Sequence, residues 1–452
     1  MRRPNEVRKN EVMTSNPAPL SSTSTPASSP GEASPAGRTA LRGRVVTPQE
    51  VIEDGVVVLD GPVIAWVGER QDAAAAGYAA AVEAAAEPVE GQVVLPGLVE
   101  VHNHGGGGAS FPDAADAHEA LVAVREHRRH GTTSLVASLV TAERETLLRR
   151  VATLADLGDA GEIVGIHLEG PFLSEVRCGA QNPHDMLAGD PGLVRAIAEA
   201  GRGHVRTMTF APEVPGNTGP GGVVETLVEV GAIPSVGHTD ASSEQTDAAI
   251  AEGVAALAAR RAELVAAGEQ VGPAPRVTAT HLFNGMRPLH HRAPGPVASC
   301  LAAAARGDLV VELVADGTHL AAGTVRSVFE LVGADAIVLV TDAMAAAGMA
   351  DGTYQLGPMA VTVADGVARL DDGTPEGSIA GGTFHLLDVV RATVGFGIPL
   401  VDAVKAASLT PAGVLGRADI GALEAGRRAD VVVTDAELHP VSVWRGGALV
   451  TD

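Results

Sequence analysis

Six polar residues that can bind a divalent metal ion each follow closely after a short apolar run. They are His102, His104, Glu169, His238, His281 and Asp342. Imidazole nitrogens and carboxylate oxygens are common ligands of zinc and other first-row metals. A bound metal lowers the pKa of its water from about 15.7 to about 7, which makes hydroxide available near neutral pH. The set therefore predicts a metal-dependent hydrolase.

Such chemistry needs a proton carrier beside the metal. Asp342 follows the apolar run VLVT and can accept a proton from water, then pass it to a leaving amine. His102 and His104 are separated by one residue, so in an extended chain their side chains point to the same side. This spacing favours a chelating pair of imidazoles.

The stretch Gly165–Ser174, GIHLEGPFLS, has the form of a strand that ends in a functional loop. An apolar run leads to Glu169, and Gly170 and Pro171 follow at once. Gly and Pro after a short apolar run mark the end of a buried strand. An acid at that point lies where barrel enzymes carry their catalytic groups.

Short apolar segments alternate with Ala-rich helical segments between Gly97 and Ala346. The expected strands are Leu98–Val101, Ser134–Leu139, Ile163–Leu168, Val205–Phe210, Ile233–Val236, Val277–Thr280, Val310–Val314 and Ile337–Val340. Eight strands with helices between them predict an α/β fold, a (β/α)8 TIM-like barrel, with the candidate ligands together at one end. The segment Val254–Ala267 is expected to be an extra helix before the sixth strand.

Strand patterns flank the barrel on both sides, and we expect them to join into one small β-sandwich domain, because isolated hairpins are marginal in water. The expected parts are a disordered Ser/Thr/Pro-rich tail (1–38), a first part of the β domain (39–96), the barrel (97–350), a second part of the β domain (351–383), helices packed on the barrel (384–416) and final β strands (417–452). Met13 offers a later start of the chain.

The composition excludes several kinds of partner. The formal net charge is −23, whereas nucleic acids and anionic membranes attract basic surfaces. No apolar run approaches the roughly 20 residues of a membrane helix, and the first residues lack the apolar core of a signal peptide. Two cysteines are too few for a disulfide framework and fit a reducing cytoplasm. We expect Cys300 in the core and Cys178 in a polar loop.

The motifs of the chain, taken in order, resemble those of one family closely. They are LPGLVEVHNHG, GIHLEGPFLS, GAQNPHD, TFAPE, SVGHTDA, ATHLFNGM, VADGTH and LVTDAM. Over about residues 40 to 440 the chain is similar to N-acetylglucosamine-6-phosphate deacetylases of the amidohydrolase superfamily. The resemblance implies hydrolysis of N-acetyl-D-glucosamine 6-phosphate to D-glucosamine 6-phosphate and acetate, in amino-sugar catabolism and cell-wall recycling.

The resemblance also implies how the metal is held. Glu169, His238 and His281 would bind the main ion, and Asp342 would act as general base and then as general acid. Some family members lack a histidine pair at the first strand and bind one metal. Because His102 and His104 are both present here, a second ion bridged by Glu169 is expected. One or two divalent ions per subunit follow, and these ligand types accept Zn, Fe, Mn or Co.

Substrate contacts are implied in the same way, at Ala180, Gln181, Asn284, Gly285, Arg292 and His319. His319 resembles a family histidine near the sugar and phosphate, and Asn284 and Gly285 resemble backbone donors to the phosphate. Arg292 matches an arginine that reaches the phosphate from the neighbouring subunit of a homodimer. Gln181 stands where many members carry a histidine that helps hold the acetyl group, and its amide can donate a hydrogen bond but carries no charge. Cys178 lies in the same loop, which resembles a lid.

Three alternatives stay open at this point. The galactosamine isomer of the substrate differs at one hydroxyl group, which the sequence does not distinguish. An aminoacylase or deaminase would share the metal ligands but would not need His319, Arg292 and the HLFNGM loop. A barrel that binds amino sugars without catalysis would be expected to lack a ligand, and all six are present.

Overall fold

A computed structural model describes residues 37–371 and 377–451 of the chain. Eight parallel strands form the central sheet: β5 (Leu98–Glu100), β8 (Thr132–Val140), β9 (Gly165–Glu169), β10 (Val205–Phe210), β11 (Ile233–Val236), β12 (Val277–Ala279), β13 (Leu309–Leu313) and β14 (Ile337–Leu339). All eight expected strands are confirmed, with ends that differ by two residues or fewer.

The two ends of this sheet meet through the segments that follow β5 and β14. Asn103 and Ala343 form an isolated parallel bridge. The backbone N–H of Asp342 donates to His102 O at 3.1 Å, and the N–H of His104 donates to Ala343 O at 2.7 Å. The sheet is therefore closed into a barrel by the segments that carry three of the six candidate residues.

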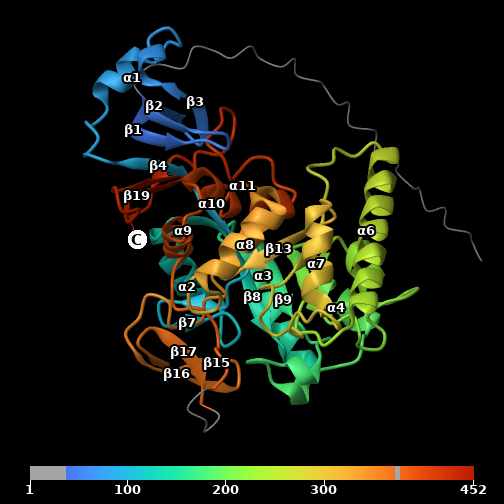
Figure 1. The fold of residues 1–452 in the computed structure, drawn as a ribbon. Helices are drawn as coiled ribbons and strands as arrows, with labels where there is room; N and C mark the ends of the chain where they lie inside the picture. The colour runs from blue at the N-terminus through green and yellow to red at the C-terminus, as the bar shows by residue number, and fades with distance from the viewer. Residues whose placement is uncertain (1–36, 372–376, 452) are drawn as a thin grey trace, which may run out of the picture. The chain divides into compact units, whose positions relative to one another are not determined.

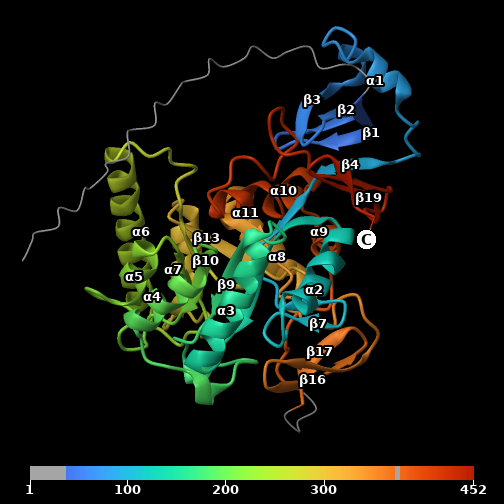
Figure 2. The ribbon, with the colours of Figure 1, turned by 180° about the vertical axis from the view of Figure 1, so that it is seen from behind.

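Helices surround the barrel strands (Figures 1 and 2). They are α2 (Ala117–Arg129), α3 (Arg144–Asp159), α4 (Pro191–Ala200), α5 (Val223–Glu229), α6 (Ser243–Ala266), α7 (Gly295–Ala305), α8 (Ala322–Val332), α9 (Leu386–Gly395), α10 (Leu400–Ala406) and α11 (Leu409–Val414). Every residue of β8 is buried: Leu135 and Leu139 belong to the large cluster that includes the helices, and Val136 belongs to a second cluster with other barrel strands. Cover on both faces explains why the barrel strands are continuous apolar runs.

Helix α6 corrects one expectation, because residues 254–267 do not form a separate helix. The helix runs without a break from Ser243 to Ala266 and begins with a capping box between Ser242 and Gln245. A Cβ added at Gly253 would lie 2.8 Å from Val277 Cγ2, so this glycine allows close packing on β12 instead of ending the helix. The Ala-rich segment simply continues the same helix.

Strands from both ends of the chain form a small sheet domain, as expected. Its strands are β1 (Arg38–Val46), β2 (Val51–Asp60), β3 (Val63–Glu69), β4 (Val93–Pro96), β18 (Val431–Thr434), β19 (Pro440–Arg445) and β20 (Ala448–Leu449), and α1 (Ala79–Ala84) contacts β1. The order is β20-β19-β18-β4-β1-β2-β3, so β4 joins the two ends of the chain. Arg428 donates to Ser134 Oγ at 2.7 Å and thereby links this sheet to barrel strand β8.

Residues 351–383 were expected to belong to the same β domain, and this expectation is wrong. The strands β15 (Gly352–Leu356), β16 (Met359–Ala364) and β17 (Val367–Leu370) form a separate three-stranded sheet. Its buried side chains pack with Val140 and Met344, near the carboxyl ends of the barrel strands. Both views place it on the opposite side of the barrel from the seven-stranded sheet (Figures 1 and 2). Strand pattern alone does not select a pairing partner, because pairing depends on contacts far apart in sequence.

The other elements are short: β6 (Gly105–Gly106), β7 (Ala109–Ser110), η2 (Arg70–Asp72), η3 (Glu175–Arg177), η4 (Pro183–Asp185) and η5 (Ala334–Ala336). The expected tail, 1–38, lies outside the described residues except for Gly37 and Arg38, and Arg38 already belongs to β1. Cys300 is fully buried in α7, as expected. Within the two described ranges, no helix combines the length and apolar character needed to cross a bilayer.

Substitution of Leu139 by Ala should test the packing between barrel and helices. The side chain is fully buried, so its removal should lower the free energy of unfolding by about 2–5 kcal/mol. Leu331→Ala is the matched control: this side chain of α8 is 62% exposed, and the change should stay within about 0.5 kcal/mol. Urea unfolding followed by circular dichroism measures both. Equal losses for the two variants would contradict the packing of β8.

Candidate active site

The candidate residues converge at the carboxyl ends of the barrel strands, around the carboxylate of Glu169. Nε2 of His238 and Nε2 of His281 each lie 2.7 Å from Glu169 Oε1. Nε2 of His104 lies 3.2 Å from the other oxygen, Oε2. Glu169 therefore has imidazoles on both of its oxygens and lies between the pair from β11 and β12 and the pair after β5.

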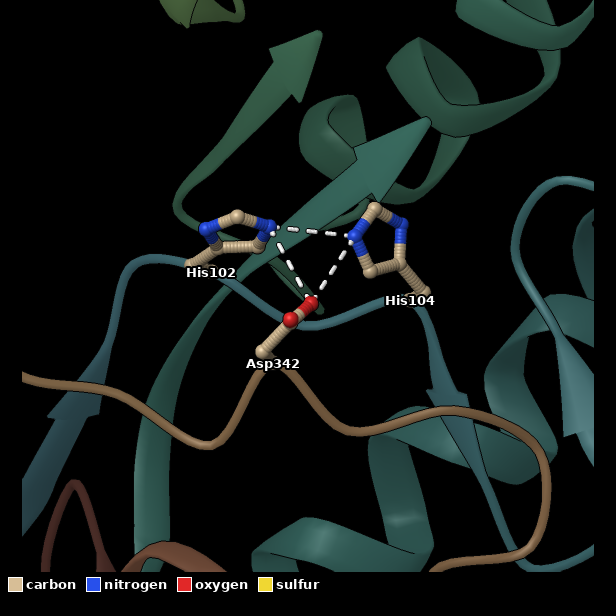
Figure 3. A group of neighbouring side chains, drawn as sticks. All are labelled: His102, His104 and Asp342. Carbon is tan, nitrogen blue, oxygen red and sulfur yellow. Dashed lines mark hydrogen bonds and ion pairs between the residues drawn. The ribbon is translucent and has the colours of Figure 1, made fainter. Parts of the chain in front are cut away.

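The second group consists of His102, His104 and Asp342 (Figure 3). The Nε2 atoms of the two histidines are 3.0 Å apart, and Asp342 Oδ1 lies 3.4 Å from His102 Nε2 and 3.3 Å from His104 Nε2. Figure 3 shows all three side chains pointing toward one another from two different segments of the chain. Two ring nitrogens and a carboxylate oxygen thus face a common point.

Three of these residues have a left-handed backbone, which is uncommon outside glycine. The φ angles are 45° at His238, 28° at His281 and 49° at Asp342. Each residue lies just after a strand, so the turn of the backbone directs the side chain into the barrel mouth. Gly285 makes room for this arrangement, because a Cβ at this position would lie 2.8 Å from His238 Nδ1. Strained backbone of this kind persists only where surrounding contacts fix it.

Two acceptors on the far side of the imidazoles set which ring nitrogen faces the cluster. His102 Nδ1 lies 3.0 Å from Glu312 Oε2, and His238 Nδ1 donates to Arg177 O at 2.8 Å. A protonated Nδ1 leaves the lone pair on Nε2, the atom that faces the other candidates. Carboxylate and carbonyl acceptors of this kind commonly orient histidines that bind metals.

The cluster holds two ionised acids in a buried place. Burial would raise the pKa of Glu169, but the imidazoles of His238, His104 and His281 outweigh it and hold that pKa well below its usual range. Burial acts in the same direction on Asp342, and His102 and His104 again lower its pKa. Burial lowers the pKa of His104, yet hydrogen bonds to Asp342 and Glu169 raise it to about 10. The acids therefore stay charged, and positive charge must stand beside them.

A divalent cation fits this donor set. The ligand atoms of His102, Glu169 and His281 lie within 4.8 Å of one another, as do those of His102, His104 and Asp342. A cation held here would compensate the two carboxylates while the imidazoles are neutral, and it would accept the lone pairs of the two Nε2 atoms that face each other at 3.0 Å. Nitrogen and carboxylate ligands suit Zn, Fe, Mn and Co.

A cavity of about 250 Å³ opens over the cluster. Five of the predicted substrate residues line it: Ala180, Gln181, Asn284, Gly285 and His319. The carboxamide of Gln181 donates to Glu169 Oε2 at 2.5 Å and accepts from the N–H of Thr141 at 2.8 Å. His319 Nδ1 lies 2.7 Å from Asp316 Oδ2, which fixes the ring.

Arg292 is not brought to this cavity within the described chain. Its side chain is exposed, and its Nη1 lies 2.8 Å from Nε2 of the neighbouring His291. It lies in the loop between β12 and α7, eleven positions after His281. Its contact with the site of a second subunit stays a prediction.

Several functional neighbours escaped the sequence analysis. Glu312 and Glu100 look like single acids in apolar strands, although both face the barrel mouth. Burial raises the pKa of Glu100 to about 8, although hydrogen bonds from Thr341 and His102 lower it. An acid inside a run such as LVVELV is a usable signal. The contribution of Arg177 through its backbone carbonyl leaves no signal in a sequence. Residues 378–381 and Leu356 also line the cavity, and their strand pattern did not indicate it.

The amidohydrolase family model matches residues 93–450. The chain belongs to the amidohydrolase family. The protein is therefore a metal-dependent hydrolase, as its family, its barrel and its buried cluster of ligands together indicate. The relatives described below confirm the resemblance that the motifs indicate.

Individual members of the family give the comparison more detail. N-acetylglucosamine-6-phosphate deacetylase from Lysinibacillus sphaericus is 32% identical over 357 residues, which are 77% of this chain and 83% of the relative. N-acetylgalactosamine-6-phosphate deacetylase from Escherichia coli O157:H7 is 31% identical over 396 residues, 85% and 96% of the two chains. The solved N-acetyl-D-glucosamine-6-phosphate deacetylase from Mycobacterium smegmatis, an Asp-to-Ala variant in complex with N-acetyl-D-glucosamine-6-phosphate, has 38% identity and a TM-score of 0.77, over 92% and 100%.

Glu312→Leu should show whether this acid holds His102 ready for a metal. Loss of the acceptor frees the ring to rotate, so metal affinity should fall about 10- to 100-fold. Glu312→Gln keeps an acceptor oxygen and should lose less, and the exposed Glu330→Leu serves as the surface control. Metal content after dialysis against graded chelator gives the affinities. Unchanged metal content in Glu312→Leu would exclude the orienting contact.

Proposed function

We propose that the protein hydrolyses the N-acetyl group of N-acetyl-D-glucosamine 6-phosphate, releasing acetate and D-glucosamine 6-phosphate. The observation that carries the proposal is the buried Glu169 cluster at the floor of a cavity whose walls contain Asn284, Gly285 and His319. Relatives and a solved neighbour that carry this activity in their names support the choice of substrate. The reaction belongs to the breakdown of amino sugars.

We assign the metal ligands from the two groups of the cluster. Glu169, His238 and His281 would hold the main ion, since both imidazoles lie 2.7 Å from one carboxylate oxygen. His102 and His104 would hold a second ion, and Glu169, whose Oε2 lies 3.2 Å from His104 Nε2, would serve both positions. One or two ions of Zn, Fe, Mn or Co per subunit satisfy these donors.

Asp342 is the proposed proton carrier. A bound divalent ion makes water acidic and polarises the amide carbonyl. The carboxylate of Asp342 is ionised because the neighbouring imidazoles lower its pKa, so it can accept a proton from the attacking water. It would then deliver that proton to the amide nitrogen, because an amine leaves poorly unless it is protonated.

The remaining site residues would bind the sugar phosphate. His319, fixed by Asp316, and the loop of Asn284 and Gly285 are proposed to contact the sugar and the phosphate. Ala180 and Gln181 would border the acetyl group, with Gln181 also fixing Glu169. Arg292 is proposed to reach the phosphate from the partner in a homodimer, where a guanidinium gives a bidentate, charge-assisted contact.

The galactosamine isomer is the second candidate substrate. A relative named for that activity is 31% identical to this chain, nearly the same as the first glucosamine relative. The two sugars differ in the orientation of one hydroxyl group. Either phosphorylated sugar would be met in the cytoplasm, which is where we place the reaction, in keeping with the two free cysteines.

Acetate release from four sugars tests the activity. The sugars are N-acetyl-D-glucosamine and N-acetyl-D-galactosamine, each with and without the 6-phosphate. Enzyme loaded with Zn, Fe, Mn or Co should release acetate fastest from the glucosamine phosphate. Asp342→Asn should lower turnover by about 10²- to 10⁴-fold with sugar binding unchanged, because the proton carrier is lost.

Two results would contradict these assignments. If no metal-loaded preparation frees acetate from any of the four sugars, the proposed hydrolysis is wrong. Near-normal turnover of Asp342→Asn would remove Asp342 from the mechanism while leaving the substrate assignment intact.

Arg292→Ala should raise KM for the phosphorylated sugar by about 10- to 100-fold, as expected for loss of a charged hydrogen bond, and should leave KM for the unphosphorylated sugar unchanged. Arg306→Ala, an exposed arginine paired with Asp308, is the control and should change neither value.

Mixed dimers test whether Arg292 acts across the interface. Mixing Arg292→Ala with Asp342→Asn subunits should create one site with a working Asp342 and an intact arginine from its partner. That site should recover the low KM. Failure to recover it, in dimers shown to exchange, would place Arg292 outside the neighbouring site.

A further inference from the structure

A second cavity, of about 310 Å³, lies at the opposite end of the barrel from the active site. Arg206 near the start of β10 and Ile233 at the start of β11 border it, whereas His238 follows the carboxyl end of β11. At about 3.3 Å of rise per residue, the length of a barrel strand separates the two cavities. No residue that lines one cavity lines the other.

The last turns of α6 and the loop after it build this second cavity. The buried residues of α6 end at Leu257, so the turns beyond it project from the barrel, as Figure 1 shows for the long helix at the right. The loop turns back onto the end of α11, where a Cβ at Gly272 would lie 2.6 Å from Gly416 O. Backbone contact therefore closes one side of the cavity.

The wall is largely apolar. Its hydrophobic side chains come from five different segments and include Val228, Leu257, Leu264, Val271, Val414 and Leu415. Its size falls at the lower end of the range of small-molecule sites, about 300–1,000 Å³, and it would hold a fused aromatic ring or a short alkyl chain. Such a wall by itself does not define a ligand.

Three arginines line this wall, and one of them, Arg260, is paired with Glu263, with Nη1 3.2 Å from Oε2. Among the residues described, neither Arg206 nor Arg261 has a carboxylate oxygen within 4.0 Å; their side chains donate only to the backbone carbonyls of Val164, at 3.4 Å, and Gly272, at 2.8 Å. Burial lowers the pKa of Arg206, and the nearby charge of Arg417 acts in the same direction. In a chain of net charge −23, two guanidinium groups without an acid beside one apolar cavity are available to bind an external anion.

We propose that this cavity binds a small amphipathic anion, with its apolar body against Leu257 and Leu264 and its carboxylate or phosphate head on Arg206 and Arg261. A guanidinium gives such a head bidentate, charge-assisted hydrogen bonds. The apolar wall excludes strongly hydrated sugar phosphates, so the site differs in chemistry from the active site. The proposal does not depend on which amino sugar the protein hydrolyses.

Isothermal titration of the metal-loaded protein with 2-naphthoate tests the proposal, with the neutral 2-naphthamide as the comparison ligand. The naphthoate should bind once per chain and at least about tenfold more tightly than the amide, the effect of one charged hydrogen bond. Arg206→Met keeps the apolar stem and should remove this preference, with little effect on the amide. Arg261→Met, in the last turns of α6, is a second variant and should act in the same direction.

Arg195→Met is the matched control, because Arg195 pairs with Glu229 on the surface and does not line the cavity. It should bind 2-naphthoate as the unmodified protein does. Excess N-acetyl-D-glucosamine 6-phosphate should not displace the probe. The proposal fails if 2-naphthoate shows no saturable binding up to its solubility limit, if both arginine variants bind it unchanged, or if the sugar phosphate displaces it.

Discussion

Compensation of two buried carboxylates is the interaction on which the rest of this structure depends. Glu169 and Asp342 are ionised although both are nearly enclosed, and an uncompensated buried charge costs several kcal/mol even after relaxation. Four imidazoles lie within 4 Å of these carboxylates. A bound divalent ion would supply the positive charge in place of protons on the imidazoles. No single strand or loop can supply six such groups, so the site requires a fold that brings many strand ends to one place.

The contacts that close the barrel are also the contacts that build the site. Asp342 donates its backbone N–H to His102, and His104 donates to Ala343, so the two ends of the sheet meet at three of the candidate ligands. Barrel stability and ligand position are therefore coupled: loosening of either segment would separate the acid from the imidazoles. The left-handed backbone at Asp342 is tolerated for the same reason, because hydrogen bonds on both sides hold it.

Much of this arrangement was predictable from the sequence, and the exceptions have physical causes. The barrel strands are buried on both faces, so they appear as plain apolar runs, and the chemically useful residues stand directly after them. Glu312 was not predictable as an orienting group because its partner His102 is more than two hundred positions away. The hydrogen bond from Gln181 to Glu169 was not predictable either, because it depends on how the loop after β9 folds back. Strands β15–β17 were recognised as strands, but their pairing and their place beside the cavity depend on contacts with β8 and with the segment after β14 that no local pattern encodes.

The net charge of the whole molecule does not predict the local charge at its two cavities. A net charge of −23 repels anions at long range, but at physiological ionic strength fields decay over about 8 Å, so a bound anion responds to its immediate neighbours. In the active site those neighbours are imidazoles whose protons or metal ions neutralise the acids. At the other end of the barrel they are two arginines without a carboxylate partner among the described residues. Acidic residues outnumber basic ones on this chain. An arginine that has no carboxylate partner beside a cavity is therefore a better guide to the ligand of that cavity than the net charge of the protein is.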